Sequence, residues 1–206
     1  MFQDRLVTKL TFVSSVIMLI AALAPPTVAG AEPATKAGAV ELKLDSSMAM
    51  VLATNRNGLP AKTRIIATEP FLEYYLTPVV DGIKQRADLS WQEAAWASAE
   101  DETPHGIEIQ LSRPQRGGRF QITWAYDANG EEKIPWYASR DYVIQLKDKA
   151  ADAWETVAEV KGNRSVIGSH PLPDKPFSFL RIYQLAGGGH PARPNLMWVG
   201  QIELIP

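Results

Sequence analysis

The chain has 206 residues, a formal net charge of −2 at pH 7 and no cysteine. The lack of cysteine excludes a disulfide framework and a lipid-modified cysteine. The lack of any lysine and arginine cluster argues against nucleic acid or an anionic membrane surface as a partner.

The first 31 residues have the pattern of a signal peptide. Arg5 and Lys9 form a weakly basic start, residues 10–23 are apolar, and residues 29–31 are the small residues that a signal peptidase needs. A membrane anchor is the alternative, but about fourteen apolar residues fall short of the roughly twenty that span a bilayer. We therefore expect residues 1–31 to be removed, the product to be secreted or periplasmic, and no transmembrane anchor to remain.

The rest of the chain is long enough for one domain of ordinary size. Residues 32–46 are rich in alanine and have no sustained period, which predicts a flexible tether before a domain over 47–206. Glycine and asparagine mark turns because they tolerate positive φ, and they divide the domain at 57–58, 117–118, 127–130, 161–163 and 187–189. The segments between these turns are short.

Several of these segments alternate apolar and polar residues, as half-buried strands do. The predicted strands are 48–54, 107–111, 120–124, 142–146, 153–160, 177–184 and 196–205, and 91–96 is the one short helix. Short strands separated by turns predict an all-β sandwich or barrel. The periodicity leaves an immunoglobulin-like sandwich and a jelly roll equally open.

Two separated blocks carry a resemblance to a known family. Residues 79–82 (VVDG) lead to 96–98 (WAS), and residues 179–182 (FLRI) lead through a glycine-rich loop to 195–204 (NLMWVGQIEL). In this order the blocks resemble the discoidin family, also called coagulation factor five/eight type C domains, within the galactose-binding-like superfamily. The resemblance covers about residues 60–206. It implies a single antiparallel jelly-roll β-sandwich that binds rather than catalyses, as a carbohydrate-binding or cell-adhesion domain.

The resemblance also implies a structural calcium ion. Many discoidin relatives hold Ca²⁺ beside the Val-Asp-Gly turn, with a glutamate near the last strand as a further ligand. Asp81 stands at the position of the turn carboxylate, and Gln201 stands where the glutamate is usual, offering a carbonyl oxygen without charge. Calcium prefers six to eight oxygen ligands. The alternative is that Asp81 only caps its turn.

In sugar-binding members of the family, loops at one end of the sandwich carry aromatic and cationic residues. An aromatic ring stacks on the apolar face of a pyranose, while Arg, His and Asn bond to hydroxyl groups. The residues of this kind in the predicted loops, and hence the predicted ligand-binding residues, are Arg86, Trp91, Trp136, Tyr137, Arg140, His190, Arg193 and Asn195.

Four of these residues also have a structural alternative. Trp136 and Tyr137 could close one end of the sandwich, while Arg193 and Asn195 could fix the geometry of their loop. We expect Trp96, Trp124 and Trp198 in the core, and Arg181 bracing a neighbouring loop rather than contacting a ligand.

Nothing in the sequence matches a catalytic motif such as Gly-x-Ser-x-Gly or His-Glu-x-x-His. We expect His105 to bond to the backbone where a strand begins, and His170 to lie in a loop. Residues 100–102 (EDE) could form the carboxylate pair of a glycosidase, but adjacent carboxylates in a loop usually face solvent. The sequence thus favours a secreted, non-catalytic domain that binds carbohydrate or a glycoconjugate. A structural, adhesion or protein-interaction domain is the first alternative, and an enzyme is the second.

Overall fold

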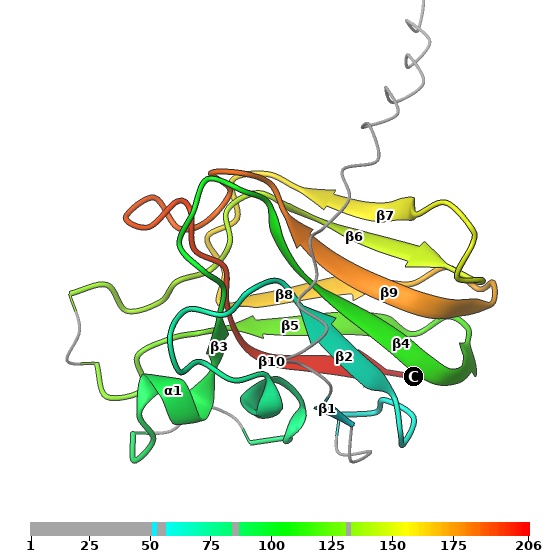
Figure 1. The fold of residues 1–206 in the computed structure, drawn as a ribbon, viewed down its shortest axis with the longest axis horizontal. Helices are drawn as coiled ribbons and strands as arrows, with labels where there is room; N and C mark the ends of the chain where they lie inside the picture. The colour runs from blue at the N-terminus through cyan, green and yellow to red at the C-terminus, as the bar shows by residue number, and fades with distance from the viewer. Residues whose placement is uncertain (1–50, 53–56, 84–86, 131–132) are drawn as a thin grey trace, which may run out of the picture. The chain divides into compact units, whose positions relative to one another are not determined.

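The computed structural model describes residues 51–206 apart from 53–56, 84–86 and 131–132 (Figure 1). The predicted signal peptide (1–31), the predicted tether (32–46) and Arg86 therefore lie outside the described residues. So does most of the predicted strand 48–54, of which Val51–Leu52 are described as a short strand. No helix in the described part of the chain is long and apolar enough to cross a membrane.

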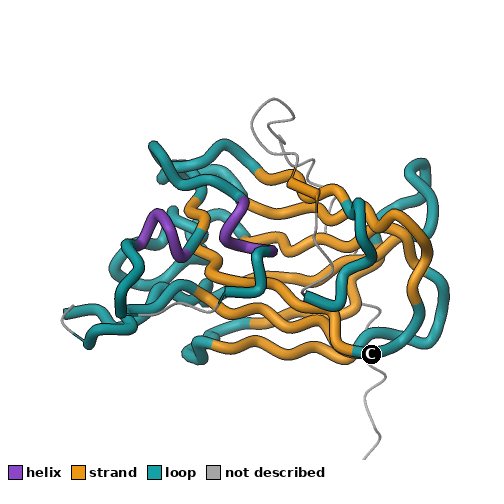
Figure 2. The backbone as a smooth tube through the Cα atoms, turned by 90° about the horizontal axis from the view of Figure 1, so that it is seen from below, coloured by secondary structure: helices purple, strands orange, loops and turns teal. Residues whose placement is uncertain are grey.

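Two antiparallel sheets face each other, as Figures 1 and 2 show. The first sheet has the order β1 (Val51–Leu52), β2 (Arg64–Ala67), β4 (His105–Gln115), β9 (Phe177–Gln184), β6 (Tyr142–Lys147) and β7 (Glu155–Val160). The second has the order β3 (Trp96–Ala97), β10 (Trp198–Ile205), β5 (Arg119–Trp124) and β8 (Ile167–Pro171). The predicted all-β sandwich is confirmed.

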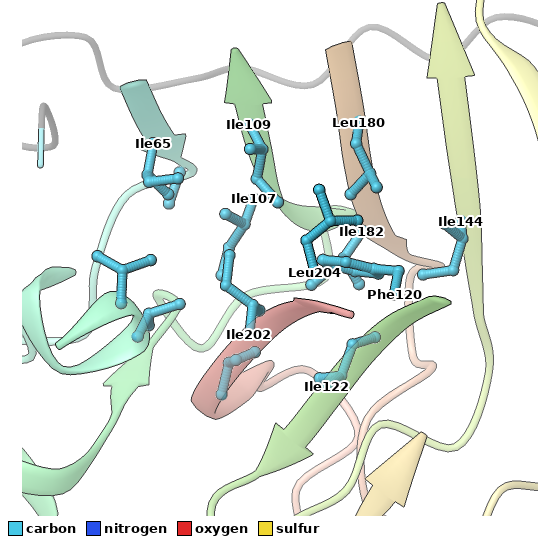
Figure 3. Packing of buried hydrophobic residues seen from close by; sticks show 14 of the residues in the cluster. Ile65, Ile107, Ile109, Phe120, Ile122, Ile144, Leu180, Ile182, Ile202 and Leu204 are labelled. Carbon is cyan, nitrogen blue, oxygen red and sulfur yellow. The ribbon is translucent and has the colours of Figure 1, made fainter. Parts of the chain in front are cut away.

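The alternating side chains meet between the sheets because the strand registers place apolar residues opposite one another. In the six-stranded sheet, Ile182 of β9 is paired with Ile107 of β4 on one side and with Ile144 of β6 on the other. In the four-stranded sheet, Ile122 is paired with Ile202. Figure 3 shows these side chains pointing toward one another from the two sheets. Trp96 and Trp124 are buried in this main core, as expected.

Two short helices lie in the connection between β2 and β3. A 3-10 helix, η1, spans Thr77–Val80, and α1 spans Trp91–Ala94. Ser90 begins α1 with a capping box: its hydroxyl oxygen accepts from the Glu93 N–H, and the Glu93 carboxylate accepts from the Ser90 N–H. The predicted helix over 91–96 is therefore present but shorter, because the chain turns into β3 at Trp96.

Two side chains have the structural roles expected for them. His105 Nε2 lies 2.9 Å from the carbonyl oxygen of Asn195, so it bonds to the backbone. Arg181 donates from Nε to Gln145 Oε1 at 2.6 Å. Its guanidinium carbon lies 4.3 Å from the ring centre of Trp154, in the connection before β7. Arg181 thus bonds to β6 and braces the connection before β7 by a cation–π contact.

The expectation for His170 was wrong. His170 lies in β8 rather than in a loop, is buried, and has its Nε2 atom 3.1 Å from the hydroxyl oxygen of Tyr142. Burial lowers the pKa of His170, and the positive charge of Arg119 lowers it further. The imidazole is therefore held neutral inside the sandwich.

We expect this histidine to make the fold less stable in mild acid. The unfolded chain takes up a proton on His170 near its ordinary pKa of about 6.5, whereas the folded chain resists protonation to a lower pH. The unfolding free energy should therefore fall as the pH drops below about 6.5. Melting temperatures between pH 8 and pH 5 measure this, with His170→Gln as the control because it removes the titrating group. An equal pH dependence in both proteins would contradict the prediction.

Candidate functional site

The loops at one end of the sandwich bring five aromatic side chains together. This aromatic cluster consists of Phe71, Tyr74, Trp91, Tyr137 and Trp198. Its members come from the segment before η1, from the first turn of α1, from the loop between β5 and β6, and from the start of β10. In Figure 1 these elements lie at the left end of the sandwich.

Trp198 is the centre of the aromatic cluster and is only 6% exposed. The ring centres of Trp91 and Tyr137 lie 4.6 and 4.8 Å from that of Trp198, in tilted arrangements. The Tyr74 ring meets Trp198 edge-on at 5.4 Å. Trp91 and Tyr137 are each half-buried, so both keep some exposed surface while Trp198 packs against them.

A polar rim lies beside the aromatic cluster. The imidazole of His190 packs edge-on against Tyr137, with 5.6 Å between the ring centres. Arg193 forms a two-pronged ion pair with Glu100, donating from Nε to Oε1 at 2.9 Å and from Nη2 to Oε2. The guanidinium carbon of Arg193 lies 5.4 Å from the ring centre of Phe71. His190, Arg193 and Glu100 thus form one edge of the aromatic cluster.

The charges of this polar rim are settled by their neighbours. The hydrogen bond from Arg193 lowers the pKa of Glu100, and the hydrogen bond to Glu100 raises the pKa of Arg193. Burial lowers the pKa of His190. At neutral pH the rim therefore offers a carboxylate, a guanidinium and a neutral imidazole, which together can donate and accept hydrogen bonds.

Three of the other predicted site residues, Trp136, Arg140 and Asn195, have contacts outside the aromatic cluster. Trp136 is adjacent to Tyr137 in an extended segment, and its side chain packs against the main core instead. Arg140 donates to the Asp141 carboxylate at 2.7 Å and to the Gly187 carbonyl at 3.2 Å, so it braces the loop before His190. Asn195 accepts from His105 through its backbone carbonyl. Arg86 lies outside the described residues.

Three residues of the cluster and its polar rim were not expected from sequence. Phe71 and Tyr74 lie between Pro70 and Pro78, in a segment for which the sequence analysis predicted neither a strand nor a site. Glu100 was expected to face solvent in an acidic loop. The signal was the density of large apolar residues in 71–75, because exposed apolar patches often mark interaction sites. Leu72 and Tyr75 of this segment are 77% and 57% exposed.

The predicted calcium ligands lie at the turn that follows η1. One carboxylate oxygen of Asp81 accepts from the Ile83 N–H at 2.6 Å, so Asp81 caps its own turn. Gln201 is buried against the same turn, and its side-chain amide contacts Gly82 and Ile83. Within the described residues, no group of three or more His, Cys, Asp and Glu side chains is placed to hold a metal ion.

Several solved structures with a similar fold are carbohydrate-binding modules. Chitosan-binding module 2 of a chitosanase/glucanase from Paenibacillus sp. IK-5, in complex with chitotriose, is 19% identical, with a TM-score of 0.52 over 72% of this chain and 98% of that chain. The family 32 carbohydrate-binding module from Streptococcus pneumoniae EndoD is 17% identical, with a TM-score of 0.51 over 71% and 96%. The family 32 module of Clostridium perfringens NanJ, in complex with galactose, is 13% identical, with a TM-score of 0.50 over 70% and 93%.

The chain has a galactose-binding-like fold. The discoidin-type sandwich expected from the sequence blocks is thereby confirmed. No protein-family model and no curated protein matches the chain. In this galactose-binding-like sandwich, the aromatic cluster and its polar rim are built by loops at a single end, while the strands beneath them hold the loops in place.

Proposed function

We propose that the chain is a non-catalytic carbohydrate-binding module and that its site is the aromatic cluster with its polar rim. One observation carries the proposal: three segments that are far apart in sequence converge at the loop end of a galactose-binding-like sandwich. They contribute Trp91, Tyr137, and the loop residues His190 and Arg193. The sugars bound to the similar structures, galactose and chitotriose, support this class of ligand.

The rings supply the apolar part of such a site. A pyranose presents C–H bonds on one face, and half-exposed aromatic rings held by a buried support are suited to stack against that face. Trp91 and Tyr137 are such rings, because Trp198 packs against both at less than 5 Å between ring centres. Stacking on rigid rings costs little conformational entropy, since the rings are already ordered without the sugar.

The polar rim supplies directional hydrogen bonds that can orient a sugar. Hydroxyl groups of a sugar both donate and accept hydrogen bonds, and the rim offers a neutral imidazole, a carboxylate and a guanidinium within one loop edge. Arg193 and Glu100 already bond to each other. A sugar hydroxyl must therefore either share one of these groups or replace their hydrogen bond, which limits the free energy gained on binding. We expect weak binding, with a Kd on the order of 0.1–1 mM, or about 4–5.5 kcal/mol.

Weak single-site binding matches a role outside the cell, where many identical glycans are presented together. The signal-peptide pattern of residues 1–31 supports export to the periplasm or the medium. Avidity would then come from several copies of the protein, or several glycans, acting at once.

A glycan array first ranks the sugars that bind the purified chain. Calorimetric titration with galactose and with chitotriose then tests the proposal. We expect Trp91→Ala or Tyr137→Ala to weaken binding at least tenfold, or about 1.4 kcal/mol. Trp154→Ala is the matched control, because Trp154 is also a half-buried aromatic residue but contacts Lys147 and Arg181 rather than the aromatic cluster. The control should bind as the wild type does.

The main alternative is a structural or protein-interaction domain. It is favoured by the contacts among the cluster rings themselves, which would also be made if the cluster only closed the end of the sandwich. The two functions differ in the titration. A wild-type chain that binds no sugar on the array, together with Trp91→Ala and Tyr137→Ala variants that melt early, would leave the aromatic cluster with packing as its only role.

A further inference from the structure

A buried network of side-chain amides joins three segments at the turn after η1. Asn57 and Gln201 are 4% and 2% exposed. Asn57 donates from Nδ2 to the Ile202 carbonyl at 2.6 Å and more weakly to the Val79 carbonyl at 3.5 Å. The network therefore connects the segment before β2, the end of η1 and the last strand of the sandwich.

The orientation of the Gln201 amide follows from its neighbours. With its nitrogen toward the Ile83 carbonyl, it donates there at 2.9 Å, and its oxygen accepts from the Gly82 N–H at 2.8 Å and from Asn57 Nδ2 at 2.5 Å. In the reverse orientation, two oxygens would face each other and the nitrogen would face two donors. Only the first orientation gives both the oxygen and the nitrogen of the Gln201 amide suitable partners.

These contacts do not fit a calcium ion at the turn. Calcium needs several oxygen atoms directed at one point, and the carbonyls of Val79, Ile83 and Ile202 are of the right kind, but each accepts from an amide nitrogen of Asn57 or Gln201. If Gln201 turned its oxygen toward a cation beside the Ile83 carbonyl, its nitrogen would meet the two donors described above. Buried donors without acceptors are costly.

We propose that the side-chain amides of Asn57 and Gln201 take the place of a structural calcium ion at this turn, so that the fold is stable without the metal. The amide nitrogens satisfy the backbone carbonyls that a cation would otherwise coordinate. The neutral amides also avoid the cost of a buried carboxylate, which would need a cation to balance its charge.

A single substitution tests whether the Gln201 amide has the role that a calcium ion would have at this turn. Glutamate at position 201 has no donor for the Ile83 carbonyl, and one of its oxygens would face that carbonyl oxygen directly. Its other oxygen could still accept from Gly82 and Asn57. In Gln201→Glu a cation between the carboxylate and the Ile83 carbonyl would therefore relieve the repulsion, as the amide nitrogen does in the wild type.

The test is the melting temperature of the full chain in EDTA, in millimolar CaCl₂ and in millimolar MgCl₂. We expect the wild type to melt at the same temperature in all three. We expect Gln201→Glu to melt lower in EDTA, by on the order of 5 °C, and to recover with CaCl₂ in proportion to the logarithm of its concentration. Gln201→Leu, which offers neither donor nor ligand, should melt lower and ignore both metals.

Each other result overturns the proposal. A wild-type melting temperature that rises with CaCl₂ would show that the turn binds the metal as it stands. A Gln201→Glu variant as stable as the wild type in EDTA would show that the amide donor contributes nothing. A Gln201→Glu variant that is destabilised but does not respond to CaCl₂ would show that the amide does not occupy a cation's place.

Discussion

Trp198→Ala should lose both stability and sugar binding. Trp198 is buried at the centre of the aromatic cluster and contacts Trp91, Tyr137 and Tyr74, so its removal leaves a large cavity beneath the rings. Replacing a buried tryptophan by alanine costs about 3–5 kcal/mol. The two half-exposed rings also lose the side chain that holds them, and we expect the affinity for sugar to fall below detection. Urea unfolding and calorimetric titration measure the two effects.

Comparison with two other variants separates support from contact. Trp91→Ala removes a half-exposed ring, so it should weaken sugar binding with a smaller loss of stability than Trp198→Ala. Trp154→Ala removes the cation–π contacts with Lys147 and Arg181, and should cost about 1 kcal/mol without changing sugar binding. A Trp198→Ala protein that unfolds at the wild-type urea concentration would show that the aromatic cluster is not packed around this residue.

Gly58→Ala should reduce the stability of the fold more than alanine at any other described glycine, because its Cβ would make the closest contact. Gly58 has φ of +70°, and a Cβ atom built on it would lie 1.8 Å from the backbone carbonyl oxygen of Leu204. The adjacent Asn57 carbonyl accepts from the Leu204 N–H at 2.8 Å, so the segment is held against β10. Because backbone cannot move aside as a flexible side chain can, we expect a loss of about 3–5 kcal/mol in unfolding free energy.

Gly130→Ala is the matched control for this prediction. Gly130 has the same φ of +70°, but apart from its chain neighbours no atom of the described residues lies within 4 Å of the position of its Cβ. Its substitution isolates the cost of a left-handed backbone in alanine, about 1 kcal/mol. Urea unfolding of the two variants under identical conditions gives the difference. Equal losses would mean that the contact with Leu204 contributes nothing.

The strand pattern determined most of the sandwich, because period-two alternation indicates a strand wherever one face is apolar. It identified β4, β5, β6, β7, β9 and β10, and it missed β2, β3 and β8. In β8 the inward-facing residues are Gly168 and His170, so no hydrophobic alternation exists to detect. In β2 three successive residues are buried in a strand of four, which leaves no polar alternation either.

The sequence by itself determined which residue types its loops carry, and the resemblance of its two blocks implied the fold that gathers those loops at one end. Only the tertiary structure decided which side chains meet. Trp136 and Tyr137 are neighbours in the chain but point to different clusters, because successive side chains of an extended segment alternate in direction. Glu100 reaches Arg193 across a sequence separation of 93 residues. Such pairings depend on where the strands place the ends of their loops. This placement is set by the three-dimensional fold and cannot be predicted from local sequence.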